Sequence, residues 1–332
     1  MYDFEAGKVK KFLKRHRVRR AAIQLPPGLR GHLTEIRAPF DEAGVEVFTL
    51  ADSCYGACDI ADAKAEQLGC GALVHYGHAD MGLKTRLPAL YVEARMTADP
   101  TDAVEAAVSG LKFKHLGLVT TVQHIHSLPR VAKFLSSLGI KPLIGKPGPR
   151  AKYEGQVLGC DWGSARSISD KADGFLYIGT GRFHPLGIAL ATGKDVVTVN
   201  PIAGSWDRLT PASEDFLIKR KAMISRAAAC DEFGILVSTK LGQARFRLAN
   251  GLRDHFKQAG LTVHVLASDE ILPEKLEDFR LKAFVCAACP RIPIDDAERF
   301  KQPILTPFEA KVMLGKANLE PYQLDEVLER DF

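Results

Sequence analysis

The sequence has no long hydrophobic run, few cysteines and only a modest net charge of +5. Its apolar runs, such as Ala72-Leu73-Val74, are far too short to cross a bilayer. No apolar run follows the basic residues near the N-terminus, so we expect no signal peptide, no membrane and a cytoplasmic location. Seven cysteines scattered over 332 residues argue against a disulfide framework and favour free thiols or metal ligands. The absence of an HExxH motif argues against a zinc hydrolase.

Acidic residues are missing from one segment, 8–20, which holds eight lysines and arginines. The simplest interpretation is a solvated helix face with Phe12 and Leu13 packed inward. The alternative is a basic surface that steers an acidic or RNA-bound partner. Aromatic residues are not interleaved with these charges as they are in a stacking platform for nucleic acid. We therefore predict no direct nucleic-acid binding.

Short apolar strands alternate with helical stretches along the whole chain, which predicts an α/β fold with parallel sheets. Two kinds of strand each recur three times. The first kind is found in "RAAIQLPPGLR" from Arg20, "HLGLVTTVQHI" from His115 and "FGILVSTKLGQAR" from Phe233. The second is found in "ALVHYGHAD" from Ala72, "GFLYIGTGRFHPLG" from Gly174 and "AFVCAACPRIP" from Ala283.

The repeat predicts three similar α/β units at 1–108, 109–222 and 223–332, each with a small parallel sheet flanked by helices. We expect the third unit to carry a C-terminal helical tail. Ligands of open α/β sheets bind beyond the carboxyl ends of the strands. Three such units that face one another would bring their strand-end loops to one central site.

Each predicted unit offers one cysteine in such a loop. Cys58 follows the apolar stretch 45–52, Cys160 lies in a glycine-rich turn, and Cys289 ends the second recurring strand of the third unit. Three thiolates, one from each unit, would leave one iron of a cubane cluster without a protein ligand. Such an open iron can bind a substrate, whereas most electron-transfer clusters have four cysteine ligands.

Two other interpretations of the cysteines stay open at this point. Structural zinc could be bound by a CxxxC and a CxxC pair, formed by Cys54, Cys58, Cys286 and Cys289. Alternatively, the thiols are unrelated to one another. The CxxxCxxC signature of radical enzymes is missing, because Ala61 stands where its third cysteine would be. We expect the remaining cysteines to act as small buried hydrophobic residues. Cys286 would pack within its sheet, and Cys70 and Cys230 in other parts of the core.

Six motifs in order resemble one known family. They are "CYGACD", "GHAD", "GCDWGSAR", "GRFHPLGIAL", "ACPRIPIDD" and "PILTPFEA". Together they resemble the radical enzyme of diphthamide biosynthesis, 2-(3-amino-3-carboxypropyl)histidine synthase in its single-chain archaeal form, over about residues 24–310. The resemblance implies a threefold α/β architecture, a homodimer and a 4Fe-4S cluster. It also implies that Cys58, Cys160 and Cys289 bind the cluster, with Cys54 packed beside Cys58.

The family moves the 3-amino-3-carboxypropyl group of S-adenosylmethionine onto a histidine of translation elongation factor 2 and releases methylthioadenosine. The resemblance therefore implies a radical transferase that acts on elongation factor 2 and needs an electron donor, which the sequence does not identify. We expect substrate contacts from polar and glycine residues of the strand-end turns, namely Gln24, Gly28, His78, Gly179, Gly181 and Gln243. Such residue types also occur in ordinary turns and helix caps.

Two rival functions remain under this interpretation. A quinolinate-synthase-like dehydratase also places three cysteines from three units around an open iron, which acts as a Lewis acid. The six motifs argue against it. A non-catalytic partner subunit would be expected to have lost one or more cluster cysteines. This chain keeps all three, so we expect a catalytic chain that pairs with itself.

Overall fold

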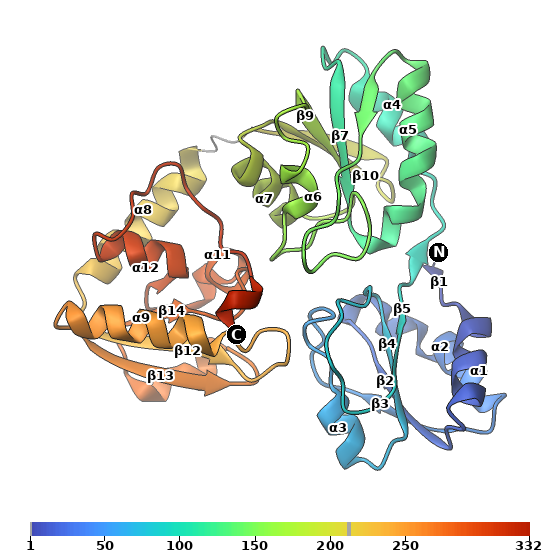
Figure 1. The fold of residues 1–332 in the computed structure, drawn as a ribbon, viewed down its shortest axis with the longest axis horizontal. Helices are drawn as coiled ribbons and strands as arrows, with labels where there is room; N and C mark the ends of the chain where they lie inside the picture. The colour runs from blue at the N-terminus through green and yellow to red at the C-terminus, as the bar shows by residue number, and fades with distance from the viewer. Residues whose placement is uncertain (1, 211–213) are drawn as a thin grey trace.

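Three lobes surround a common centre in the computed structural model, which describes residues 2–210 and 214–332 (Figure 1). Each lobe is built on one small sheet with helices packed on it, and the C-terminus lies near the centre where the lobes meet (Figure 1). The predicted α/β fold with small parallel sheets flanked by helices is confirmed.

The three sheets share one strand order, in which the first strand in sequence lies between the second and the third. The first sheet, ordered β3-β2-β4-β5, contains β2 (Arg20–Gln24), β3 (Glu46–Leu50), β4 (Ala72–Tyr76) and β5 (Ala89–Val92). The second, ordered β8-β7-β9-β10, contains β7 (His115–Thr120), β8 (Lys141–Leu143), β9 (Gly174–Ile178) and β10 (Val196–Asn200). The third, ordered β13-β12-β14-β15, contains β12 (Glu232–Ser238), β13 (Thr262–Ser268), β14 (Ala283–Cys286) and β15 (Ile304–Leu305).

These strands pair in parallel, as the sequence predicts. The two recurring strand types are the first and third strands of each sheet. Two pairings were not expected. The second sheet gains an antiparallel edge strand, β11 (Ser205–Leu209), and β1 (Tyr2–Asp3) pairs antiparallel with β6 (Arg95–Met96).

The helices lie between the strands in sequence. The α-helices are α1 (Ala6–Arg15), α2 (Leu33–Asp41), α3 (Asp62–Gln67), α4 (Thr101–Val108), α5 (Leu128–Ser137), α6 (Gly163–Arg166), α7 (Phe183–Thr192), α8 (Glu214–Ala228), α9 (Phe246–Gln258), α10 (Pro273–Leu276), α11 (Ile292–Asp295) and α12 (Pro307–Met313). The 3-10 turns are η1 (Pro27–His32), η2 (Val122–Ser127), η3 (Glu277–Phe279), η4 (Ala297–Arg299) and η5 (Glu329–Asp331). Among the described residues, no helix has the length and apolar character that a membrane span requires.

Alternating side chains of each central strand fill two cores, one on each face of its sheet. In β12, Ile235 and Val237 pack in one core and Leu236 in the other. In α1 the basic residues face solvent, while Leu13 is buried and Phe12 packs partly against the core of the first sheet. Each lobe thus has its own apolar cores, although Ala79 of the first lobe packs in a core of the second sheet. The strand-end loops are left to meet one another.

Helix packing bears on where the units divide. Helix α4 packs on β10 and β11 of the second sheet, and α8 packs on α12 and β15 of the third. We therefore propose a first boundary just before α4 and a second just before α8. The prediction of a helical tail at the C-terminus is wrong, because after α12 the described residues form only one short helical turn, η5. The backbone there bonds to neighbouring loops, as in the bond from Val327 N–H to Cys160 O.

Candidate metal centre

The loops that carry Cys58, Cys160 and Cys289 meet at the centre of the three lobes. Cys58 lies between β3 and α3, Cys160 lies in the turn before α6, and Cys289 follows β14. Cys58 and Cys289 line one cavity of about 290 Å³. Burial raises the pKa of Cys160, and the sulfurs of the other two cysteines raise it further. The structure thus brings one thiol from each sheet into electrostatic reach of the other two.

The spacing of these sulfurs is wider than one metal ion can bridge. Tetrahedral zinc with Zn–S bonds of about 2.3 Å holds its sulfurs about 3.8 Å apart. Within the described part of the chain, the only trio of possible ligand atoms within 4.8 Å of one another is Cys54, His75 and His78. The three central sulfurs are therefore not arranged as a site for a single metal ion. The alternative zinc set of four cysteines is not assembled, because Cys286 is packed in the core of the third sheet.

The loop after β12 makes the closest contacts with Cys58. Gln243 Nε2 lies 3.2 Å from the Cys58 sulfur, and Gly242 N–H donates to the Cys58 carbonyl oxygen at 2.9 Å. A Cβ atom on Gly242 would lie 2.6 Å from Cys58 Cα, so only glycine allows this approach. The expected residue Gln243 is thereby placed beside the thiols.

An arginine from the second lobe reaches the same place. Arg150 Nη2 donates to the carbonyl oxygen of Gly242 at 2.8 Å. Its Nη1 is buried and has no hydrogen-bond partner among the described residues. The positive charge of Arg150 opposes the rise in the pKa of Cys58 and Cys160 that burial causes. A buried donor without a partner costs free energy, so this geometry suits an anionic group held between the thiols.

The thiols would have to lose protons to bind a metal. Burial raises the pKa of Cys58, and it raises that of Cys289 to about 12. Metal binding at this centre would therefore release protons. Gln243 and Arg150 act in the opposite direction on Cys58, because each stabilises its thiolate.

A buried ion pair joins the first and third lobes next to Cys58. Lys240 Nζ lies 2.6 Å from Asp59 Oδ1, and both side chains are almost fully buried. Burial lowers the pKa of Lys240. The hydrogen bond to Asp59 and the negative charges of Asp59, Asp269 and Glu270 outweigh this effect, so the pKa is raised overall. The ammonium stays charged and holds the residue that follows Cys58.

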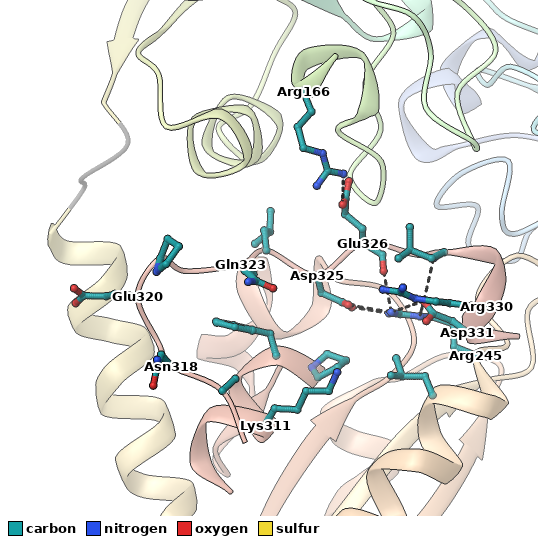
Figure 2. A pocket seen from close by; sticks show the side chains of 17 residues that line it. Arg166, Arg245, Lys311, Asn318, Glu320, Gln323, Asp325, Glu326, Arg330 and Asp331 are labelled. Carbon is teal, nitrogen blue, oxygen red and sulfur yellow. Dashed lines mark hydrogen bonds and ion pairs between the residues drawn. The ribbon is translucent and has the colours of Figure 1, made fainter. Parts of the chain in front are cut away.

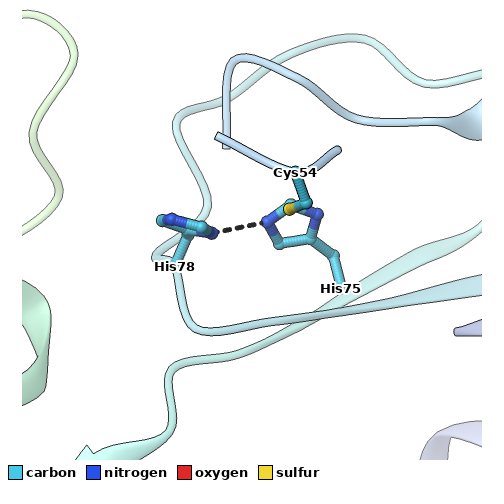
Figure 3. A group of neighbouring side chains, drawn as sticks. All are labelled: Cys54, His75 and His78. Carbon is cyan, nitrogen blue, oxygen red and sulfur yellow. Dashed lines mark hydrogen bonds between the residues drawn. The ribbon is translucent and has the colours of Figure 1, made fainter. Parts of the chain in front are cut away.

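Gln24 and His78 belong to a network inside the first lobe. Gln24 Oε1 accepts from Ala61 N–H at 3.1 Å and lies 2.9 Å from His75 Nδ1, while its Nε2 donates to Asp59 O. His75 Nε2 lies 2.9 Å from His78 Nδ1, and Cys54 lies beside the two rings (Figure 3). Because Gln24 Oε1 accepts, His75 Nδ1 carries the proton and its Nε2 accepts from His78.

The expected glycines lie elsewhere. Gly28 lies in η1 with open space where a Cβ would be. Gly179 and Gly181 follow β9 with φ of 152° and 79°, conformations that favour glycine, and Gly181 lines a second cavity of about 630 Å³. Arg291 and Asp295 line both this cavity and the one that contains Cys58 and Cys289, so the two cavities adjoin.

The other cysteines have the packing roles expected of them, with one difference. Cys70 and Cys54 are buried, but Cys230 is only partly buried. Cys230 follows the end of α8. Its sulfur lies 3.6 Å from the carbonyl oxygen of Arg226 in that helix and 3.6 Å from that of Lys282, which precedes β14. The residue that sequence reasoning missed altogether is Arg150, because its loop has no motif and it reaches the thiols only through the tertiary fold.

Comparison with known proteins gives the family. The family model for diphthamide synthesis proteins matches residues 25–323, most of the chain. The chain belongs to the diphthamide synthesis protein family. The 2-(3-amino-3-carboxypropyl)histidine synthase of Pyrococcus horikoshii is 36% identical to it over 330 residues, which cover 99% of this chain and 94% of the relative. Subunit 1 of the synthase of Eremothecium gossypii is 30% identical over 325 residues, which cover 95% of this chain and 75% of the relative.

A solved structure shows that this diphthamide synthesis protein shares its whole fold with a relative. The crystal structure of Dph2 from Pyrococcus horikoshii with a 4Fe-4S cluster matches with a TM-score of 0.92 at 36% identity, covering 99% of this chain and 95% of that chain. The resemblance carried by the six motifs is therefore confirmed, and the family argues against the rival dehydratase.

Proposed function

We propose that the protein transfers the 3-amino-3-carboxypropyl group of S-adenosylmethionine to a histidine of translation elongation factor 2, the first step of diphthamide biosynthesis. The observation that carries the proposal is the meeting of Cys58, Cys160 and Cys289, one from each sheet, in a chain of this family. The relatives named as synthases and the Dph2 structure with a 4Fe-4S cluster support it.

The three cysteines would hold a 4Fe-4S cluster, with one iron left open for substrate. The amide of Gln243 beside Cys58 fits an anionic cluster, and so does the buried Arg150 Nη1, which has no hydrogen-bond partner among the described residues. When bound and reduced, such a cluster supplies one electron to the sulfonium of S-adenosylmethionine. Which of the three carbon–sulfur bonds then breaks depends on how the protein positions the substrate.

The cavity beside Cys58 and Cys289 has side chains of both charges, as a zwitterionic amino acid with a cationic sulfur requires. Its acidic residues are Asp269, Glu270, Asp295 and Asp296, and its basic residues are Lys240, Arg291 and Arg299. Gln243 lines this cavity together with Cys58, and its Nε2 lies 3.2 Å from the Cys58 sulfur. Of the expected contact residues, Gln243 is the best supported, and Gly181 belongs to the adjoining cavity.

The remaining expected contacts stay proposals with weaker support. The described bonds of Gln24 all lie within the first lobe, so its role there is to hold the loop after Cys58. His78 can still present its Nε2 to a substrate, because its Nδ1 pairs with His75. We also propose a homodimer, a cytoplasmic location and a separate electron donor, on the strength of the family resemblance.

The test is to identify the nucleoside that the protein releases. The iron-loaded protein is prepared without oxygen and given dithionite and S-adenosylmethionine. We expect methylthioadenosine and an aminocarboxypropyl fragment, only with dithionite and not with the Cys160→Ala variant. Deoxyadenosine would indicate a conventional radical enzyme and would contradict the proposal. No cleavage by protein shown to carry iron would favour a non-catalytic subunit.

A further inference from the structure

Arg245 is a buried arginine with 2% of its surface exposed, at the start of α9. Its guanidinium donates to both carboxylate oxygens of Asp325 at 2.5 and 2.9 Å and to Asp331 Oδ2 at 3.0 Å (Figure 2). It also lies 3.5 Å from the carbonyl oxygen of Ala288, which precedes Cys289. One side chain thus joins the C-terminal segment to the loop of the third cysteine.

The same arginine anchors the loop that contacts Cys58. The backbone N–H of Arg245 donates to the carbonyl oxygen of Gln243 at 2.9 Å, and Gln243 contacts the Cys58 sulfur. A guanidinium fixed by two carboxylates has little freedom to move, since the paired hydrogen bonds set its plane. Fixing Arg245 therefore fixes the short loop that reaches from the third lobe to the first.

The C-terminal segment holds the loop of Cys160. Val327 N–H donates to the carbonyl oxygen of Cys160 at 3.1 Å, and Glu326 Oε1 accepts from Trp162 N–H at 3.0 Å. The other oxygen of Glu326 pairs with Arg166, which reaches down from the second lobe (Figure 2). The carbonyl oxygen of Glu326 accepts in turn from the same guanidinium, Arg245 Nη2, at 2.9 Å.

The Cys160 loop contacts the C-terminal segment directly, and the loops of Cys58 and Cys289 are linked to it through Gln243 and Arg245. Residues 325–331 contain only the turn η5, and they lie beyond the part of the chain that the family model matches, 25–323. A cavity of about 810 Å³ lies between this segment, α12 and the start of α9 (Figure 2). Charged and backbone contacts attach the segment along its length, and the Val327 side chain in its middle is buried.

We propose that Arg245 and residues 325–331 form a brace that positions the loops of Cys58, Cys160 and Cys289 relative to one another. The need for a brace follows from the fold, since each sheet has its own cores and the ligands come from three sheets. Holding the loops in place before binding reduces the ordering entropy that metal binding would cost. The inference rests on the proposed cluster, and Arg245 is in this account a positioning residue.

The test compares a chain that ends at Leu324 and the variants Arg245→Met and Arg245→Lys with the parent protein. Arg253→Met is the matched control, because Arg253 lies on the same helix and, among the described residues, pairs with its neighbours Asp254 and Asn250 alone. Two rates are measured: iron loss to a chelator without oxygen, and labelling of each thiol by a maleimide in the metal-free protein, mapped by mass spectrometry. Cys70, buried in the first lobe, is the internal control for labelling.

We expect the truncated chain and Arg245→Met to lose iron about tenfold faster or more, since several charge-assisted hydrogen bonds are removed. Cys160 of the metal-free variants should be labelled faster, with Cys70 and the far-ultraviolet circular dichroism unchanged. Both rates of Arg245→Lys should lie between those of the parent protein and of Arg245→Met. A lysine ammonium keeps the charge but cannot form the forked hydrogen bonds that the guanidinium makes with the two carboxylates.

Parent-like rates in both assays would overturn the brace. So would faster labelling that comes with lost secondary structure, because the segment would then serve folding instead of positioning. Labelling of the metal-free protein does not need a cluster. A parent protein that binds no iron would therefore contradict the proposed function, while the labelling result would still decide on the brace.

Discussion

Gln243 Nε2 lies 3.2 Å from the sulfur of Cys58, so a side chain from the third lobe donates to a thiol of the first. This contact and the Lys240–Asp59 ion pair cross the same boundary between lobes. The environment of the Cys58 sulfur is therefore set by residues about 180 positions away along the chain, which only the folded arrangement of three sheets can supply.

Replacing Gln243 by Leu should make a bound cluster harder to reduce. A hydrogen bond to a ligand sulfur favours the more negative, reduced state, so its loss lowers the reduction potential. We expect a shift on the order of 50 mV toward negative values, which corresponds to about 1 kcal/mol. A redox titration followed by electron paramagnetic resonance measures it. Gln258→Leu, at an exposed position of α9, is the control. An unchanged potential at full iron content would contradict this role.

Gly242→Ala should disturb the Cys58 loop, because the new Cβ would lie 2.6 Å from Cys58 Cα and 2.9 Å from its carbonyl oxygen. Overpacking of this kind costs about 1–3 kcal/mol. We expect less iron per chain and faster labelling of Cys58 in the metal-free protein. Gly251→Ala is the matched control, since a Cβ there meets nothing within 4 Å and the position lies inside α9. Equal iron contents of the two variants would show that the close approach is not needed.

Arg220→Met should destabilise the third lobe without acting on the cysteines directly. Arg220 is buried and donates to both oxygens of Glu309, at 2.6 Å to Oε1 and 2.5 Å to Oε2. Its removal leaves a buried carboxylate without its cation, which costs about 3–5 kcal/mol. Urea unfolding of the metal-free protein measures the loss. The double variant Arg220→Met/Glu309→Leu should recover part of it. A loss below about 1 kcal/mol in the single variant would refute this account.

The stability of the metal-free protein should fall as the pH drops from about 6.5 toward 4. Burial lowers the pKa of His124 to about 4, and the charge of His126 adds to this shift. An unfolded histidine has a pKa of about 6.5, so in this window the unfolded chain binds a proton that the folded chain does not. His124→Gln should therefore reduce the slope of stability against pH by about 1 kcal/mol per pH unit near pH 5. An unchanged slope would mean that His124 titrates alike in both states.

The fold was largely predictable because the signals for it are local. Apolar strands of the kinds that begin at Arg20 and Ala72 each recur three times, and they became the first and third strands of the three sheets. The edge strand β11 was not predicted, since four of its five residues are exposed and it has no apolar run. The C-terminal tail was predicted wrongly as helical, because its structure is decided by contacts with loops of other lobes.

The cysteines of the centre could be chosen from motifs, but their surroundings could not. Arg150 lies in a loop of the second lobe, while Lys240 and Arg245 lie in the loop between β12 and α9. No local pattern shows which of these side chains reach the thiols. Gln24 was expected to contact substrate because of its place after a strand, yet its described hydrogen bonds hold the segment after Cys58. Long-range pairs such as Lys240 with Asp59, 181 positions apart, follow from the packing of whole lobes.

The most direct test of the central claim is the iron content of five variants purified without oxygen, each with one cysteine replaced by alanine. Alanine at Cys58, Cys160 or Cys289 should each remove the iron and its visible absorption, because every sheet contributes one ligand. Alanine at Cys54 or Cys286 should leave close to the parent amount, since one thiol lies beside the two histidines and the other in a core. Loss of iron from Cys54→Ala together with its retention by Cys58→Ala would contradict the assignment.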